Sequence, residues 1–162
     1  MKKLILASSL ALLAISAQAQ TAGYYGGVEM FNNRFTDHTS TTGGGIFAGY
    51  RLGNGLAFEV NGNRIGTLNI GTDKLSVSQM SVSALYSLPV SNTVSVIGRL
   101  GYGNMRVSQA NSFSNRGFKL DDGMIYGGGI SYQVNKQVAI RGEFRKPESD
   151  IRGFGVGVSY NF

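Results

Sequence analysis

The amino-acid sequence predicts an all-β protein, and more closely an eight-stranded antiparallel up-and-down transmembrane β-barrel. Apolar and polar side chains alternate with a period of two in eight successive segments, which is typical of strands that have two different faces. Tight turns and longer loops alternate between these segments. Aromatic residues gather toward the strand ends on the apolar face, as they do at the two interfaces of a membrane barrel.

The eight segments are expected to form strands, each with one apolar face. In chain order, the first four apolar faces carry Tyr24, Val28 and Met30 in residues 23–35, Ile46 and Tyr50 in 46–52, Phe58 and Val60 in 56–64, and Met80, Val82 and Tyr86 in 76–88. The last four carry Val96, Leu100 and Tyr102 in 94–104, Ile130 and Tyr132 in 124–134, Val138 and Ile140 in 137–145, and Phe154, Val156 and Val158 in 154–162.

The predicted connections differ in length at the two ends of the strands. Residues 52–55, 89–93 and 135–136 are short and rich in turn-forming residues. The longer connections are expected at residues 36–43, 65–74, 106–122 and 146–152. Short turns at one end and longer loops at the other are typical of an outer-membrane barrel, and both chain ends then lie on the short-turn side.

The amino-acid composition excludes several kinds of scaffold and functional site. The 162 residues include 24 glycines and only 2 prolines, and 15% are charged, against roughly 25% in an average soluble domain. The chain has no cysteine and a single histidine. These counts exclude a disulfide scaffold, a cysteine nucleophile and a multi-histidine metal cage. We therefore expect no cofactor and no metal site.

The first residues predict an export signal. Two lysines follow the initial methionine, an apolar run extends from Leu4 to Ile15, and residues 17–19 form a small-x-small cleavage site. The run is shorter than the roughly 20 residues of a membrane-spanning helix. We expect residues 1–19 to be a signal peptide and residues 20–162 to be the barrel domain. Despite the formal net charge of +6, an exported protein is expected to have no nucleic-acid partner.

Alternation alone leaves open which face meets water. A soluble lipocalin-like barrel also alternates, but its apolar face points inward. Here the polar face is mostly glycine, serine, asparagine and glutamine, and such small residues fit the narrow interior of an eight-stranded barrel. The last strand also ends on Phe162, and an apolar edge strand is protected from aggregation when a barrel closes on it. Both observations favour a barrel whose apolar face points outward and contacts lipid.

Four motifs resemble the OmpA-type outer-membrane β-barrel family, which includes opacity-protein and NspA-like small barrels. They are Gly49-Tyr50-Arg51-Leu52, Phe58-Glu59-Val60, Gly128-Gly129-Ile130-Ser131-Tyr132 and Gly157-Val158-Ser159-Tyr160-Asn161-Phe162. The resemblance spans residues 22–162 and implies a location in the bacterial outer membrane. It also implies that Tyr160 and Phe162 are the aromatic positions of the signal that the barrel-assembly machinery recognises.

Two departures from the family limit what the resemblance implies. Full OmpA carries a periplasmic peptidoglycan-binding domain, whereas this sequence stops at Phe162, so we expect no attachment to the cell wall by that route. The predicted loops are also shorter than those of typical opacity adhesins.

Seven charged residues lie on the face predicted to point into the barrel. They are Glu29, Arg51, Glu59, Arg99, Arg141, Glu143 and Arg145. We expect an interior salt-bridge ladder, because the planar guanidinium of arginine makes bidentate contacts with carboxylates. Such a ladder is either a structural plug or a gated path for ions or protons. The narrow interior of an eight-stranded barrel favours the plug.

Two motifs suggest catalysis or nucleotide binding only superficially. His38 lies within Asp37-His38-Thr39-Ser40, whereas the lipid A deacylases of the resembled family use histidine and serine on a strand late in the chain. Neighbours on one loop do not by themselves form a catalytic triad, so we expect a polar surface loop and no enzyme. The run Gly43-Gly44-Gly45 loosely fits a dinucleotide pattern but precedes a strand rather than a helix.

The third long loop interleaves basic and aromatic residues. Its binding candidates are Arg106, Arg116, Phe118 and Lys119. Exposed loops on a rigid scaffold commonly carry function, and basic side chains attract phosphate-bearing molecules. A merely solvated loop is the alternative.

Together these observations predict a structural, surface-exposed outer-membrane protein whose loops bind envelope lipids or host molecules, as adhesins do. The expected partners are outer-membrane lipid and lipopolysaccharide, the barrel-assembly machinery and a host surface ligand. Two alternatives stay open: a narrow ion or solute pore through the barrel, and a lipid A-modifying enzyme.

Overall fold

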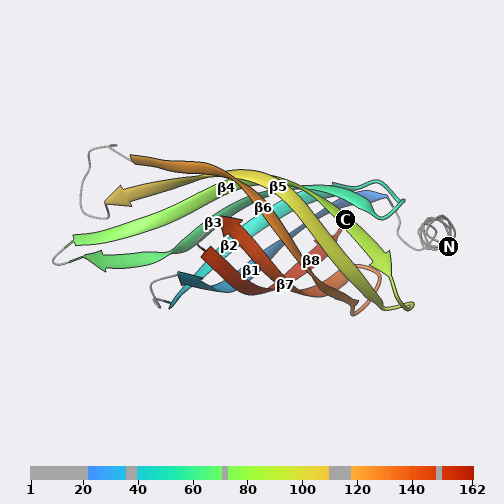
Figure 1. Cartoon of the computed structure of the whole chain (residues 1–162). Helices are drawn as coiled ribbons and strands as arrows, with labels where there is room; N and C mark the ends of the chain where they lie inside the picture. The colour runs from blue at the N-terminus through green and yellow to red at the C-terminus, as the bar shows by residue number, and fades with distance from the viewer. Residues whose placement is uncertain (1–21, 36–39, 71–72, 110–117, 149–150) are drawn as a thin grey trace, which may run out of the picture.

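The computed structural model describes residues 22–35, 40–70, 73–109, 118–148 and 151–162, and in them the chain forms one closed antiparallel barrel (Figure 1). The strands are β1 (Gly23–Phe35), β2 (Ser40–Arg51), β3 (Leu56–Ile70), β4 (Asp73–Pro89), β5 (Val94–Gln109), β6 (Phe118–Gln133), β7 (Val138–Glu148) and β8 (Ile151–Asn161). Each strand pairs with the next, and β8 pairs with β1 to close the sheet. The predicted fold class is confirmed.

The strands extend further toward the loops than the sequence pattern predicts. Residues expected to form loops continue the pairing, for example Leu68 with Leu75 across β3 and β4, and Val107 with Phe118 across β5 and β6. Arg106 and Gly43 likewise belong to β5 and β2 rather than to loops. The alternation of apolar and polar residues ends where a strand leaves the lipid, but backbone hydrogen bonding does not need that alternation.

Three tight turns connect the strands at the other end, as predicted. Each turn is held by a side-chain oxygen that accepts backbone N–H groups: Asn54 Oδ1 from Leu56, Ser91 Oγ from Val94, and Asn135 Oδ1 from Val138. Asparagine and serine favour turns for this reason. Gly53 and Gly55 adopt positive φ values of 76° and 85°, a conformation that glycine enters without steric cost.

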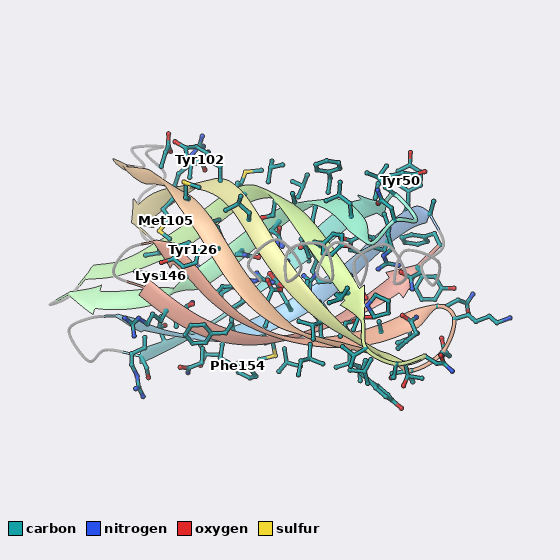
Figure 2. All side chains as sticks on the ribbon, turned by 45° about the vertical axis from the view of Figure 1, so that its right-hand side comes forward. Tyr50, Tyr102, Met105, Tyr126, Lys146 and Phe154 are labelled. Atoms are coloured by element: carbon teal, nitrogen blue, oxygen red, sulfur yellow. The ribbon has the colours of Figure 1, made fainter. Side chains whose placement is uncertain are left out.

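The outer surface of the barrel is apolar. The side chains that alternate outward remain exposed, from Val28 and Met30 on β1 to Phe154 and Val156 on β8. Aromatic rings mark the two edges of this band: Tyr50 lies toward the short-turn end, and Tyr102 and Tyr126 lie toward the loop end (Figure 2). Among the residues that the structure describes, no helix is long and apolar enough to cross a membrane.

The inner surface alternates large and small residues across neighbouring strands. Tyr25 on β1 lies opposite Gly49 on β2, and Gly27 lies opposite Phe47. A Cβ atom at Gly27 would lie 2.4 Å from the Phe47 ring, and one at Gly49 would lie 2.7 Å from the Tyr25 ring. The high glycine content therefore provides interior space for large side chains, which fill a barrel of this size.

Candidate functional site

Six of the charged residues singled out from the sequence meet inside the barrel, and all come from odd-numbered strands. They are Glu29 on β1, Glu59 on β3, Arg99 on β5, and Arg141, Glu143 and Arg145 on β7. The even-numbered strands place small residues beside them. Gly45 pairs with Glu29, Gly49 and Ser83 pair with Glu59, and Gly129 pairs with Glu143.

These six residues form a closed ring in which carboxylates and guanidinium groups alternate; we call it the ion-pair ring. Arg99 Nη2 lies 2.7 Å from Glu59 Oε1, and Arg99 Nε also donates to Glu143. Arg145 Nη2 bridges Glu143 Oε2 at 2.9 Å and Glu29 Oε2 at 2.5 Å. Arg141 then completes the ring.

Arg141 joins the two carboxylates that remain. Its Nη2 lies 3.0 Å from Glu29 Oε2, and its Nη1 lies 2.6 Å from Glu59 Oε2. Every member therefore contacts at least two partners of opposite charge, and the formal charges of three glutamates and three arginines cancel. The sequence predicts interior pairing, but the ring follows only from the register of the closed barrel.

The ring is largely buried and is supported by neutral groups. Glu59 and Glu143 are 0% and 2% exposed. Tyr25 Oη donates to Glu59 Oε2 at 3.0 Å, and Asn61 Nδ2 donates to Glu59 Oε1 at 2.9 Å. The Arg141 guanidinium stacks 3.7 Å from the centre of the Phe47 ring. Buried charges are tolerated when they are paired and hydrogen-bonded in this way.

Arg51 does not belong to the ion-pair ring, and this corrects the predicted ladder. It points inward, but within the part of the chain that the structure describes no carboxylate lies at ion-pair distance from it. Its Nη1 instead donates to Asn161 Oδ1 at 3.2 Å, and its guanidinium lies 5.0 Å from the centre of the Tyr25 ring. The reason is position: Arg51 ends β2 beside the first tight turn, whereas the ring lies further along the barrel.

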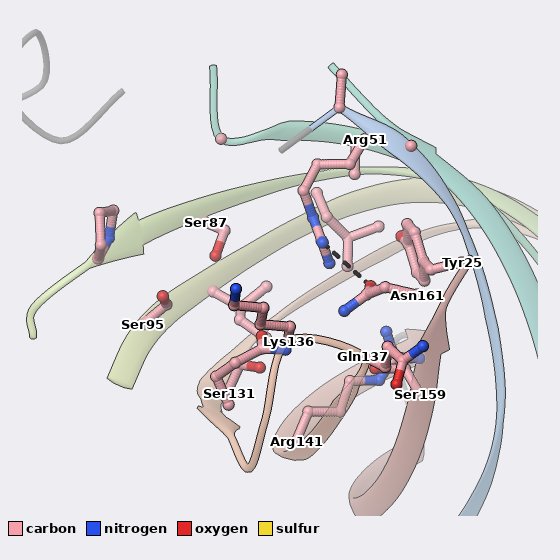
Figure 3. A pocket seen from close by; sticks show the side chains of 18 of the residues that line it. Tyr25, Arg51, Ser87, Ser95, Ser131, Lys136, Gln137, Arg141, Ser159 and Asn161 are labelled. Carbon is pink, nitrogen blue, oxygen red and sulfur yellow. Dashed lines mark hydrogen bonds between the residues drawn. The ribbon is translucent and has the colours of Figure 1, made fainter. Parts of the chain in front are cut away.

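Cavities in the described structure lie on the two sides of the ring. The larger, about 590 Å³, opens at the short-turn end and includes Arg51 and Arg141 in its lining (Figure 3). The smaller, about 20 Å³, lies beside Arg99 and Arg145 toward the loop end. A space of that size holds about one water molecule. The ring separates them.

The remaining predicted site residues lie outside this cluster. Arg106 is exposed on the outward face of β5. Phe118 and Lys119 are the first two residues of β6. Arg116 and His38 fall outside the described residues. Tyr160 and Phe162 point outward, with their rings 5.4 Å apart in an edge-to-face contact. Their role as an assembly signal stays a prediction.

Four outward-facing arginines gather at the loop end, and of these the sequence pattern singled out only Arg106, as a loop residue. Arg34, Arg64, Arg106 and Arg152 are exposed just beyond the apolar band, and we call them the arginine belt. Each continues the outward alternation of its strand, as Arg34 follows Val28, Met30 and Asn32 on β1. Extending the period-two pattern past the apolar residues would have found them. Across the β1–β8 seam, Arg34 pairs directly with Arg152.

Comparison with known proteins agrees with this architecture. The family model described as "Outer membrane protein beta-barrel domain" matches residues 5–162. Outer membrane protein A of Klebsiella aerogenes is 23% identical over 197 residues, covering 100% of this chain and 56% of the relative. The protein of the same name from Escherichia coli O157:H7 is 21% identical, covering 100% of this chain and 55% of the relative. The chain thus spans about half the length of these relatives.

Solved structures share the fold. Neisserial surface protein A superposes with a TM-score of 0.64 at 21% identity, covering 88% of this chain and 100% of that one. The N-terminal β-barrel domain of Pseudomonas aeruginosa OprF gives 0.63 at 16% identity, covering 88% and 100%. Ail of Yersinia pestis, in complex with the heparin analogue sucrose octasulfate, gives 0.56 at 16% identity, covering 87% and 97%. With the family model matching nearly the whole sequence, the chain belongs to the outer membrane protein beta-barrel domain family and is a protein of the bacterial outer membrane.

Proposed function

We propose that this protein is a surface barrel closed by its ion-pair ring, and that its arginine belt binds the phosphate groups of lipopolysaccharide. The observation that carries the proposal is the Arg34–Arg152 pair. These residues are direct partners across β1 and β8, and both are exposed. Like charges placed directly opposite each other are destabilising unless an anion lies between them.

The position of the belt favours a lipid headgroup. Its side chains share the outward face with the apolar band, so they point sideways into the membrane boundary rather than up from the loops. In outer-membrane barrels the longer loops face the cell exterior, which puts the belt in the outer leaflet. Arginine suits phosphate because its planar fork makes two parallel hydrogen bonds.

A second part of the belt lies on the opposite side of the barrel. Arg64 on β3 and Arg106 on β5 both pair with Ser78 on β4, so they flank one small polar residue. Asp122, the carboxylate described on this outer face, is the strand partner of Asn104 on β5 and so lies on the same side of the barrel as Arg106. The β1–β8 seam lies away from this carboxylate. The seam therefore offers the clearer test.

The test is to measure lipopolysaccharide binding by the purified barrel in nonionic detergent. The double variant Arg34→Gln/Arg152→Gln should weaken binding at least tenfold, and dephosphorylated lipid A should bind wild type as weakly as that variant binds the intact lipid. Lys136→Gln, in a turn at the opposite end, controls for the loss of a positive charge elsewhere on the barrel and should leave lipopolysaccharide binding unchanged. Unchanged binding by the double variant would contradict the proposal.

A sulfated host polysaccharide is the second candidate occupant of the belt. Ail, which shares the fold, is the protein solved with a heparin analogue. Sucrose octasulfate added to the same assay should compete with lipopolysaccharide if the belt accepts both kinds of anion. If sucrose octasulfate bound more tightly than lipopolysaccharide, a sulfated host polysaccharide would become the favoured ligand of the belt.

The pore alternative is less favoured by the geometry. The ring carboxylates are almost fully buried, and the described cavities lie on opposite sides of the ring. Wild-type protein in a planar lipid bilayer should therefore show no steady unitary conductance. A steady conductance that disappears in a variant filling the barrel would favour a pore instead.

A further inference from the structure

The short-turn end of the barrel contains a cavity with an unusual charge. This vestibule has a volume of about 590 Å³ and is lined by residues from several strands and from the tight turns (Figure 3). Its size falls within the roughly 300–1,000 Å³ of small-molecule sites. Short turns mark the periplasmic end of an outer-membrane barrel, so the vestibule opens away from the arginine belt.

Cations line the vestibule without an acidic side chain. Arg51, Lys136 and Arg141 are among its lining residues, and no aspartate or glutamate is. The three arginines of the ring already neutralise its three glutamates. The charge of Arg51 is therefore in excess over the described interior carboxylates, and the described groups that contact it are the amide oxygen of Asn161 and the Tyr25 ring.

The surroundings of Arg51 suit a small anion. Figure 3 shows Arg51, Lys136 and the polar side chains of Ser131 and Asn161 around the same space. Hydroxyl and amide groups add hydrogen-bond donors to the guanidinium. Buried Tyr25, Leu85 and Ile97 also contribute to the lining, and such apolar walls lower the local dielectric and strengthen the attraction between opposite charges.

We propose that the vestibule is an anion-binding site for a phosphate group, with Arg51 as the principal contact and Lys136 at its mouth. The group comes either from a soluble phosphate compound or from an anionic phospholipid headgroup of the inner leaflet. The proposal is independent of the arginine belt, because the two sites lie at opposite ends of the barrel and share no residue.

The experiment follows backbone amide signals of the full barrel by NMR during titration with tripolyphosphate. The barrel is first placed in nanodiscs of phosphatidylcholine. Saturable shifts are expected at the vestibule residues Ser131 and Asn161. Arg51→Gln should weaken binding at least tenfold, while Lys146→Gln, on β7 at the other end, should leave it unchanged. Lys136→Gln, in an exposed turn, should weaken binding several-fold and serves as the second variant if Arg51→Gln does not fold.

A second arm identifies the source of the phosphate. Phosphatidylglycerol replaces part of the phosphatidylcholine in nanodiscs without tripolyphosphate. Shifts at the same residues would assign the site to a lipid headgroup, whereas shifts with tripolyphosphate alone would assign it to a soluble compound. Absence of saturable shifts in both arms, or equal binding by wild type and Arg51→Gln, would overturn the proposal. Lipopolysaccharide binding measured on the same variants tests the function proposed for the arginine belt separately.

Discussion

The inner and outer faces of the barrel wall use arginine in opposite ways. Inside, Arg99 and Arg141 are 5% and 6% exposed, and each contacts at least two glutamates. Outside, Arg34 and Arg152 are exposed and lie opposite each other across the seam. The inner arginines are bound by glutamates of the same protein, whereas Arg34 and Arg152 expose their side chains beside each other on the outer face. Under the proposed function, arginine stabilises the barrel on the inner side of the strands and binds lipopolysaccharide on the outer side.

The largest difference between the two faces should appear when one charge is removed. Glu59→Gln leaves Arg99 and Arg141 each with one carboxylate fewer in a buried site, and we expect the free energy of unfolding to fall by about 3–5 kcal/mol. Arg106→Gln on the outer face should change it by less than about 0.5 kcal/mol. Guanidinium titrations in micelles, followed by circular dichroism because the chain has no tryptophan, measure both.

A double variant sharpens this prediction. Because Glu59 and Arg99 contact each other, Glu59→Gln/Arg99→Gln should cost less than the sum of the two single variants. Strict additivity would mean that the ring members act independently and would contradict the pairing proposed for the inner face.

A smaller change in stability is expected when a glycine on each face of the barrel wall is replaced by alanine. A Cβ atom at Gly27 would lie 2.1 Å from the Val158 carbonyl oxygen and 2.4 Å from the Phe47 ring. Gly27→Ala should therefore destabilise the barrel by about 1–3 kcal/mol through overpacking. Gly98, on the outer face, has nothing within 4 Å of such an atom. Gly98→Ala is the matched control, and equal losses for both variants would show that interior space is not what Gly27 provides.

The smallest expected effect comes from salt. Raising the salt from 0.1 to 0.5 M shortens the screening length, which weakens attraction between exposed charges far more than between buried ones. Lipopolysaccharide binding by wild type should fall several-fold, while the free energy of unfolding should change by less than about 0.5 kcal/mol. A stability loss as steep as the binding loss would indicate that the ring is accessible to ions.

The sequence predicts the faces of the barrel better than its contacts. Period-two alternation correctly assigns Glu59, Arg99 and Arg141 to the interior, because side-chain direction depends only on neighbouring residues. It cannot show that Arg51 stays apart from the ring, because that depends on how far along the barrel each residue lies. It also cannot show that Arg34 faces Arg152, since residues 118 positions apart meet only when β8 closes on β1. The strand ends were underestimated because polar residues continue the hydrogen-bonded pairing beyond the lipid.

The placement of the ring on odd-numbered strands has a consequence for assembly. Strands β1 to β6 bring Glu29, Glu59 and Arg99, two carboxylates for one guanidinium, and β7 alone supplies the other three members. The ring is therefore incomplete until β7 joins the sheet, because half of its members come from that one strand. Until then Glu29 and Glu59 lack Arg141, and Glu29 also lacks Arg145. The ring thus makes the burial of two early carboxylates depend on the arrival of the penultimate strand.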